Sequence, residues 1–417
     1  MPDSSPTPMQ QAEADALDVD SALQRLLAQA RPLGGQQLVA VEQGLGRVLA
    51  QDLRSPIDVP GMDNSQMDGY ALRSADVPAP GTALHVAQRI AAGQVGQPLL
   101  PGQAARIFTG APIPPGADAV VMQEQCRADG AQVFVDQQPQ PGQWVRPRGF
   151  DVRQGSVVLQ RGQRLRPQDL GQAASVGVAQ LQLAPRPRVA LLCTGDELAA
   201  PGQPLKPGGV YNSNRYMLRA LLEALGCEVS DLGQVADTLE ATRHALAEAA
   251  RGHDLVLSSG GMSVGGEDHV RPAVQVQGHL AHWRIAIKPG RPLAFGAVHR
   301  GDGTSAHFIG LPGNPVSSFV TFVLFVRPFV LALQGASRLT PRALLLPSAS
   351  DWPRADKRRE FLRARVGDDG RVELHPEQNS AVLSSTVWGD GLVDNPAGRS
   401  FAAGDMVRFL AFSELLG

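Results

Sequence analysis

The chain has 417 residues, of which 43% are hydrophobic and 19% charged, and its formal net charge is −2. That length allows two to four domains, and the weak charge gives no general attraction to nucleic acid or anionic membranes. Glycine (45 residues) and proline (33 residues) are abundant. Their abundance favours short strands and turns over long helical bundles.

The cysteines and the N-terminus bear on the cellular compartment. Three widely spaced cysteines without a C-x-x-C pair predict neither a disulfide framework nor a cysteine zinc site, so a reducing cytoplasm fits. The acidic, polar N-terminus has no signal-peptide pattern, and we expect residues 1–15 to be a disordered tail. We expect no run of transmembrane length, and therefore no membrane partner.

The first half of the chain predicts two small domains. Leucines at helical spacing indicate a helix within residues 17–30, and a strand and a short helix follow it. Between residues 55 and 149, short apolar runs alternate with prolines and glycines, which predicts a β-rich domain. Residues 150–186 return to a strand and a helix that begins near Pro167. We group them with residues 16–54 as a mixed α/β, linker-type domain.

The second half predicts an α/β domain followed by a β domain. Residues 187–335 alternate strands with amphipathic helices, one of them capped by Asp237, and end in an apolar helix from Pro315. This alternation predicts a mostly parallel, doubly wound sheet, in which ligands bind beyond the carboxyl ends of the strands. Residues 336–417 predict a small C-terminal β-barrel-like domain.

One loop of the α/β domain carries most information about a ligand. In DLVLSSGGMSVGGEDHV, residues 254–270, a predicted strand runs directly into serines and glycines, and Glu267 and Asp268 follow. Small residues after a strand let backbone N–H groups approach an anion, and carboxylates beside a phosphate call for a divalent cation between them. The segment therefore predicts a phosphorylated, metal-bridged ligand, with a purely structural strand-to-helix turn as the alternative.

Other predicted strand ends of the same domain are also rich in small and polar residues. They are found in CTGDEL, YNSNRY, IKPGRP and GLPGNPVSS. Helix capping or turn stiffening explains any one of these loops, but their concentration in one domain favours a shared ligand site. Lys288 is one of only three lysines among 38 basic residues, and its ammonium suits a phosphate or another oxyanion.

Two further segments carry charged residues whose roles stay open. The β-rich segment and the stretch after it contain Asp68, Thr109 and Asp151 in turn-like sequences. On a C-terminal strand, Arg363 and Arg365 would share one face and could meet an anion together. A solvated edge strand with protective charges is the alternative for these arginines.

Taken together, eight strings resemble the molybdopterin molybdotransferase family, of the bacterial MoeA and eukaryotic gephyrin type. In chain order they are DNSQMDGYALR, RIFTGAPIPPGADAVV, GFDV, CTGDEL, YNSNRYML, SGGMSVGGEDHV, AIKPGRPLAFG and GLPGNPVSSF. The resemblance implies an elongated four-domain homodimer whose α/β domain binds molybdopterin. It implies insertion of molybdate into adenylylated molybdopterin with Mg²⁺-assisted release of AMP. A molybdopterin adenylyltransferase is the implied substrate donor.

The resemblance also implies site residues, in a cleft between the α/β domain of one subunit and the β-rich domain of the other. The catalytic set would be Asp68, Thr109, Asp151, Arg284, Lys288, Arg363 and Ser380. The pterin and its phosphate would be held by Thr194, Gly195, Asn212, Ser213, Asn214, Ser258, Gly260, Gly261, Ser263, Gly265, Arg291, Pro312 and Asn314. The Mg²⁺ ligands would be Glu197, Asp237 and Asp268.

Two of these assignments depart from the family pattern, and two other functions stay open. Arg284 stands where the family often has lysine, and Arg358 rivals Arg363 because the loop before Ser380 differs in length. One alternative function is adenylyl transfer to molybdopterin on the same α/β domain. The other is a non-catalytic molybdopterin carrier or scaffold.

Overall fold

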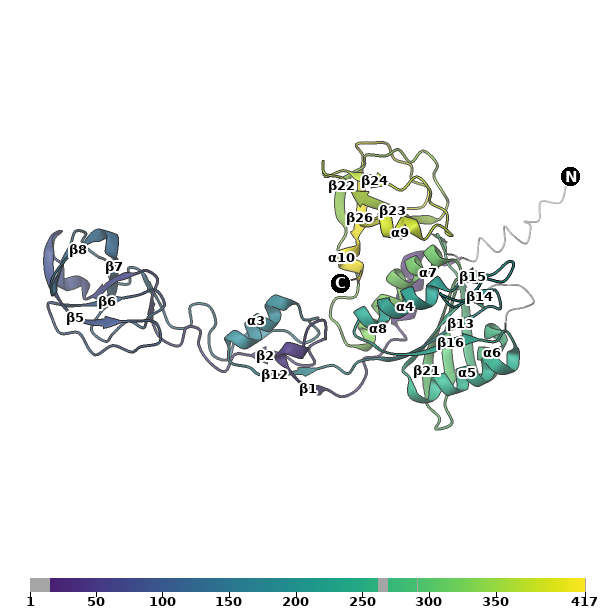
Figure 1. Ribbon diagram of the computed structural model, residues 1–417, viewed down its shortest axis with the longest axis horizontal. Helices are drawn as coiled ribbons and strands as arrows, with labels where there is room; N and C mark the ends of the chain where they lie inside the picture. The colour runs from purple at the N-terminus through teal and green to yellow at the C-terminus, as the bar shows by residue number, and fades with distance from the viewer. Residues whose placement is uncertain (1–15, 262–268, 291, 417) are drawn as a thin grey trace.

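The structure, a computed structural model, describes residues 16–261, 269–290 and 292–416. The molecule is elongated, with the β-rich domain at one end, the mixed domain in the middle and the α/β and C-terminal domains together at the other end (Figure 1). This arrangement confirms the predicted fold class, a multidomain α/β plus β protein.

The α/β domain is built on a six-stranded sheet. The strand order is β16 (Glu228–Val235), β13 (Arg188–Thr194), β17 (Leu255–Ser259), β21 (Ser305–Leu311), β20 (Pro292–His299) and β18 (Gly278–Arg284). The first four strands are parallel to one another, and β20 runs antiparallel to both of its neighbours, β21 and β18. From β13 the chain crosses to β16 on one side, whereas from β17 it crosses to β18 at the far edge. The carboxyl ends of β13 and β17 therefore form the switch point at which such sheets bind ligands.

Helices cover both faces of this sheet (Figure 1). One face carries α4 (Ser213–Ala224) and a long helical run, and the other carries α5 (Leu239–Gly252) and α6 (Val270–Gln277). The cap of α5 is Thr238, whose side chain accepts a hydrogen bond from the Ala241 backbone N–H. The expectation that Asp237 caps this helix is therefore wrong. Its carboxylate stays available for another role.

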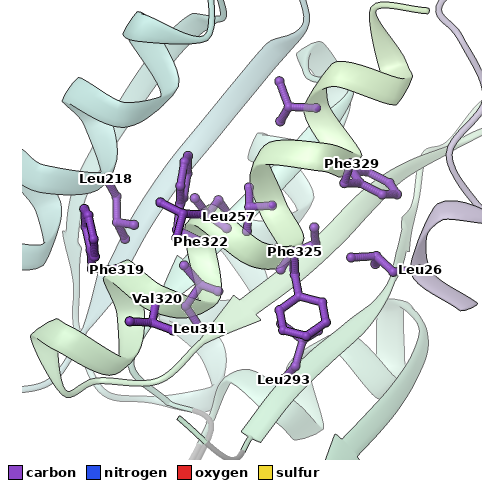
Figure 2. Packing of buried hydrophobic residues seen from close by; sticks show 14 of the residues in the cluster. Leu26, Leu218, Leu257, Leu293, Leu311, Phe319, Val320, Phe322, Phe325 and Phe329 are labelled. Carbon is purple, nitrogen blue, oxygen red and sulfur yellow. The ribbon is translucent and has the colours of Figure 1, made fainter. Parts of the chain in front are cut away.

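The long helical run forms the centre of the largest core. It comprises α7 (Pro315–Thr321), a π-helical turn η4 (Phe322–Val326) and α8 (Arg327–Leu333). Its phenylalanines pack against sheet residues such as Leu257 and Leu311 (Figure 2). Each buried phenylalanine contributes about 1.5–3 kcal/mol by leaving water. Pro328 has no N–H to donate to the backbone one turn earlier, which accounts for the widened turn just before it.

This run corrects the expectation that no segment reaches membrane-spanning length. Pro315–Leu333 has 19 residues and a mean hydropathy of 2.1, so by length and composition alone it could cross a bilayer. However, 89% of that window is buried inside the protein. A helix that is apolar on all sides is also what the centre of a large core requires.

The C-terminal domain shares its sheet and its core with the α/β domain. The sheet order is β19 (Ile287–Lys288), β23 (Arg359–Val366), β25 (Gly391–Asn395), β26 (Met406–Ala411) and β22 (Leu344–Pro347), with β24 (Val372–Leu374) beside β23. Strand β19 comes from the α/β domain and pairs parallel with β23. Phe361 and Leu410 belong to the same buried cluster as Phe322. These two domains therefore form one packed unit.

The mixed domain is small and is tied to the α/β domain by polar contacts. It pairs β1 (Gln37–Ala40) with β12 (Gln180–Leu183) and β2 (Leu53–Arg54) with β11 (Val157–Leu159), and adds α3 (Pro167–Ser175). Arg164 donates to the carbonyl of Ala224 at the end of α4, 2.8 Å away. The helix α2 (Val19–Leu27), which we grouped with this domain, instead packs its buried side chains into the α/β core. Leucine spacing shows that a helix has an apolar face but not which core receives it.

The β-rich domain has a six-stranded sheet of its own. The order is β7 (Ala119–Met122), β4 (Gly69–Leu72), β6 (Gln103–Ile107), β5 (Thr82–Ile90), β9 (Gln132–Val135) and β8 (Cys126–Asp129). Each face of the sheet packs its own apolar cluster. Two segments connect this domain to the mixed domain. They are hydrogen-bonded to each other, because Asp58 of the first segment accepts from the Arg148 side chain and from the backbone N–H of Gln154 in the second.

Candidate functional site

A cleft of about 1320 Å³ lies at the carboxyl ends of β13, β17 and β21, under the C-terminal domain. This is the switch point identified above from the strand connections. Thirteen of the residues assigned from the sequence line it. They are Thr194, Gly195, Glu197, Asn212, Ser213, Asn214, Asp237, Gly260, Gly261, Lys288, Pro312, Asn314 and Ser380.

The two glycines after β17 are needed for the shape of the cleft. Gly260 and Gly261 have φ of +90° and +68°, a conformation that favours glycine. A Cβ on Gly260 would lie 2.7 Å from the carbonyl oxygen of Thr194, and one on Gly261 would lie 2.9 Å from the Thr194 hydroxyl. The loop backbone therefore passes directly over the end of β13. Ser258 is fully buried beneath it and does not line the cleft.

Two buried polar atoms in the cleft wall have no partner within the described residues. Asn214 donates to the Ser259 hydroxyl (2.9 Å) and to the carbonyl of Gly313 (2.8 Å), which holds the first turn of α4 to the ends of β17 and β21. Its oxygen Oδ1 and the hydroxyl of Thr194 form no hydrogen bond there. Leaving such a group unsatisfied costs about 1–3 kcal/mol. These atoms are therefore suited to a polar ligand in the cleft.

The first turns of α4 and α7 also face the cleft, and both are held in place by side chains. Asn212 caps α4 by accepting from the backbone N–H of Arg215. Asn314 precedes α7 and donates to the hydroxyl of Ser380, 3.2 Å away, while the N–H of Val316 donates to the Ser380 carbonyl. Helix N-termini favour anions through their free N–H groups and dipole.

The cationic wall of the cleft is supported by two carboxylates, the buried Glu360 and the half-buried Asp356. The Lys288 ammonium lies 3.0 Å from Glu360 and 3.3 Å from Asp356. Arg358 also lines the cleft and binds both oxygens of Asp356, at 2.9 and 2.8 Å. These hydrogen bonds hold the pKa of Asp356 well below its usual range. Glu360 is only 1% exposed and also accepts from the indole N–H of Trp352.

The acidic side of the cleft carries Glu197 and Asp237. The third carboxylate expected at a metal, Asp268, lies outside the described residues, as do Ser263, Gly265 and Arg291. Within the described residues no group of three His, Cys, Asp or Glu side chains is placed to hold a metal ion. Two carboxylates still fit Mg²⁺, because this ion is commonly bound by one or two carboxylates together with substrate phosphates.

Arg363 and Arg284 do not line the cleft. Arg363 is 1% exposed and donates to the Ser385 hydroxyl and the carbonyl of Asn379, so it supports the wall from inside the C-terminal domain. Burial lowers the pKa of its guanidinium to about 10. Arg365, expected on the same face, is exposed and paired with Glu373. Of the two rival arginines, Arg358 is the one that reaches the cleft. Arg284 is exposed at the end of β18.

Asp68, Thr109 and Asp151 lie toward the opposite end of the same chain. Asp68 and Thr109 belong to the β-rich domain, and Asp151 is in the segment that connects it to the mixed domain (Figure 1). The backbone N–H and the hydroxyl of Thr109 both donate to one oxygen of Asp68 at 2.8 Å, which lowers the pKa of that carboxyl. A single chain does not bring these residues to the cleft.

Several cleft residues were missed from the sequence. Tyr211 and Leu198 come from the short parallel pair β14 (Leu198–Ala199) and β15 (Val210–Tyr211), and Gln378 and Asn379 precede Ser380. The signal was their position, because Leu198 and Tyr211 stand inside the strings CTGDEL and YNSNRY, and Gln378 and Asn379 directly precede Ser380. The polar run before Ser380 also gave no hint that its loop would reach a helix N-terminus.

The fold and the cleft define a class: a multidomain α/β protein with a ligand cleft at the ends of parallel strands, covered by a β domain. Three family models match in series. They are the MoeA N-terminal region, domains I and II (residues 17–177), a probable molybdopterin binding domain (190–332) and the MoeA C-terminal region, domain IV (346–412). The chain therefore belongs to the MoeA family, the molybdopterin molybdenumtransferases.

Individual relatives agree over nearly the whole chain. The chain is 38% identical to a molybdopterin molybdenumtransferase of Haemophilus influenzae, over 96% of this chain and 100% of the relative. It is 36% identical to one from Synechococcus elongatus, over 93% and 97%. Among solved structures, a MoeA protein from Pyrococcus horikoshii superposes with a TM-score of 0.82 at 28% identity, covering 95% of this chain and 100% of the other.

Proposed function

We propose that this protein is a molybdopterin molybdenumtransferase of molybdenum cofactor biosynthesis, which inserts molybdate into adenylylated molybdopterin and releases AMP. One observation carries the proposal. A single cleft combines a glycine loop and two helix N-termini, which suit a phosphate, with two cationic side chains, Lys288 and Arg358, that are held in place by carboxylates. Two reactants of like charge need both kinds of group at one place.

The pterin end of the substrate would lie against the switch point. Backbone N–H groups of the Gly260–Gly261 loop and the first turn of α4 would hold its phosphate. The Thr194 hydroxyl would donate to or accept from the polar edge of the pterin, and the Asn214 amide oxygen would accept from it, since neither atom has a partner among the described residues. The cleft would thereby orient the sulfur atoms that receive molybdenum.

Lys288 and Arg358 would hold molybdate beside the pterin. An ammonium is a point charge for an oxyanion, and a guanidinium adds two parallel donors. Asp356 and Glu360 keep both cations in place. Binding both anions in one cleft makes their encounter effectively unimolecular, which is the main rate contribution expected of this chain.

Glu197 and Asp237, with Asp268 as a third candidate, would hold Mg²⁺. The ion, when bound, supplies positive charge to the pyrophosphate and its AMP leaving group. The chain itself contributes the carboxylates and keeps Asp237 out of a capping role.

The site would be completed by a second copy of the chain. Asp68 and Thr109 would be supplied by the β-rich domain of the partner subunit, and Asp151 by the segment that connects this domain to the mixed domain. The homodimer is supported by exposed apolar side chains near the connecting segments: Ile57, Met62 and Phe150 are 46%, 47% and 65% exposed. A molybdopterin adenylyltransferase would supply the substrate. A cytoplasmic location agrees with three unpaired cysteines.

The decisive experiment is to incubate the purified protein with adenylylated molybdopterin and Mg²⁺, with and without molybdate, and to measure AMP. We expect release that depends on molybdate. Consumption of ATP with unmodified molybdopterin would instead indicate an adenylyltransferase. Binding of the pterin without molybdate-dependent release would indicate a carrier. Either outcome contradicts the proposal.

A further inference from the structure

The β-rich domain carries two like charges side by side on its sheet. Arg89 of β5 and Arg106 of β6 are register partners in a parallel pair. Charges of one sign directly opposite each other destabilise a sheet. The ring of Phe108 is shared between them, with the guanidinium carbons 4.5 and 4.8 Å from its centroid. Such a local conflict in a folded chain is a typical mark of a functional site.

These two arginines differ from the other arginines stacked on aromatic rings in the described part of the chain. Arg127 stacks on Phe134 but is paired with Asp136, and Arg365 stacks on Trp388 but is paired with Glu373. The same holds for Arg359 on Phe361, which is paired with Asp394.

Arg89 and Arg106 form no ion pair with any described residue. Arg106 donates only to the backbone carbonyl of Gly69 and to the Gln123 side chain, at 2.8 and 2.5 Å. No described carboxylate lies within ion-pair distance of either guanidinium, although the charge of Arg106, after the hydrogen bonds from Thr109, helps to lower the pKa of the nearby Asp68 carboxyl. Two planar guanidinium groups in this state are well suited to a phosphate.

A carboxylate with an unused oxygen lies next to this pair along the chain. Thr109 occupies one oxygen of Asp68 with both of its hydrogen bonds, and the other oxygen accepts none from the described residues. Asp68 immediately precedes Gly69, to which Arg106 is bonded. An exposed carboxylate oxygen is a suitable acceptor for ribose hydroxyls, as in dinucleotide sites. Phosphate donors and a ribose acceptor together describe a nucleotide site.

We infer that Arg89, Arg106, Phe108 and Asp68 form a binding site for a nucleoside monophosphate, the adenylate part of the substrate. The phosphate lies between the two guanidinium groups, the ribose on Asp68 and the base against the exposed plane of Arg89. The identity of the nucleotide rests on the proposed function. The site itself rests on the arrangement of these four residues.

The test is the binding of AMP to the full-length protein, measured by isothermal titration calorimetry. Arg89 is exposed, so Arg89→Ala should fold normally, and Arg127→Ala is the matched control because it removes a stacked but neutralised arginine of the same domain. We expect Arg89→Ala to weaken AMP binding about 10-fold or more and Arg127→Ala to leave it unchanged, because hydrogen bonds between charged groups are the strong ones. Binding should also weaken with added salt.

Two further ligands define the chemistry of the site. Adenosine should bind far more weakly than AMP, and inorganic phosphate should be bound in an Arg89-dependent way but more weakly than AMP. The inference is overturned if Arg89→Ala binds AMP as the unchanged protein does, or if phosphate alone binds as tightly as AMP.

The activity assay separates this inference from the proposed function. If the protein binds AMP through Arg89 but shows no molybdate-dependent AMP release, the nucleotide site stands and the proposed reaction fails. If the protein is active, we expect Arg89→Ala to raise KM for adenylylated molybdopterin without changing KM for molybdate. An active protein in which Arg89→Ala changes neither AMP affinity nor either KM overturns the nucleotide site and leaves the reaction intact.

Discussion

At the scale of single residues, the cleft depends on carboxylates that do not themselves reach the ligand. Glu360 is buried and shared between Lys288 and Trp352, and Asp356 joins Lys288 to Arg358. Long cationic side chains lose much entropy when they are fixed. Pairing them in advance means that this loss has already occurred before molybdate arrives.

Replacing Glu360 by glutamine should test this support. Glutamine keeps the size and an acceptor for Trp352 but removes the charge that holds Lys288. We expect KM for molybdate to rise about 10-fold, equivalent to ~1.4 kcal/mol, with a smaller change in kcat. Glu373→Gln, which removes the exposed partner of Arg365 in the same domain, is the control. Equal effects of the two substitutions would contradict a positioning role.

Acid stability should report on Asp356. Hydrogen bonds from Arg358 lower its pKa in the folded state, so its stabilising contribution is complete above the unfolded value of about 4 and is lost as pH falls below it. The free energy of unfolding should therefore fall more between pH 5 and pH 3 in the unchanged protein than in Asp356→Asn. Denaturant titrations at both pH values measure this difference. Parallel losses would show that Asp356 is not the group responsible.

At the scale of elements, the sequence was a good guide to the order and type of helices and strands, but a poor guide to which domains contact one another. Alternating strands and helices indicated the doubly wound sheet, and loops at strand ends indicated where ligand groups gather. Spacing could not show that the two residues of β19 leave one domain to join the sheet of another. Nor could it separate Arg358 from Arg363, because β23 is buried on both faces from Glu360 to Ala364, so that strand alternation does not show which side chain reaches the cleft. Local chemistry likewise allowed both Asp237 and Thr238 as the cap of α5.

The glycine loop after β17 makes a prediction at this scale. Gly260→Ala places a methyl group 2.7 Å from the Thr194 carbonyl at a φ of +90°. The loop must shift, so we expect activity to fall about 10-fold or more, with a stability loss of about 1–2 kcal/mol. Gly252→Ala is the matched control, because a Cβ there meets nothing within 4 Å. Activity assays and thermal unfolding of both variants check this. Normal activity in Gly260→Ala would contradict the proposed phosphate loop.

At the scale of the whole molecule, the β-rich domain lies at one end and the α/β and C-terminal domains, whose residues line the cleft, lie at the other (Figure 1), so the proposed shared site requires two chains. Neither Asp68→Ala nor Lys288→Ala alone should be active. When the two are mixed and allowed to exchange subunits, half the dimers are mixed and each of these has one intact site. We therefore expect about a quarter of normal activity from the symmetry of a dimer. Mixtures that stay inactive, although subunit exchange is demonstrated by mass spectrometry, would contradict the shared site.

The strand β19 has a consequence for how the protein admits its substrates. Strand β19 of the α/β domain pairs with β23 of the C-terminal domain, and these two domains share a core. The C-terminal domain therefore cannot move away from the cleft without breaking a sheet and exposing phenylalanines to water. Movement is far cheaper at the two connecting segments between the β-rich and mixed domains, which are held to each other by a few hydrogen bonds. In the dimer proposed above, we therefore expect substrates to enter and leave by movement of the partner's β-rich domain, while the C-terminal domain stays in place over the cleft.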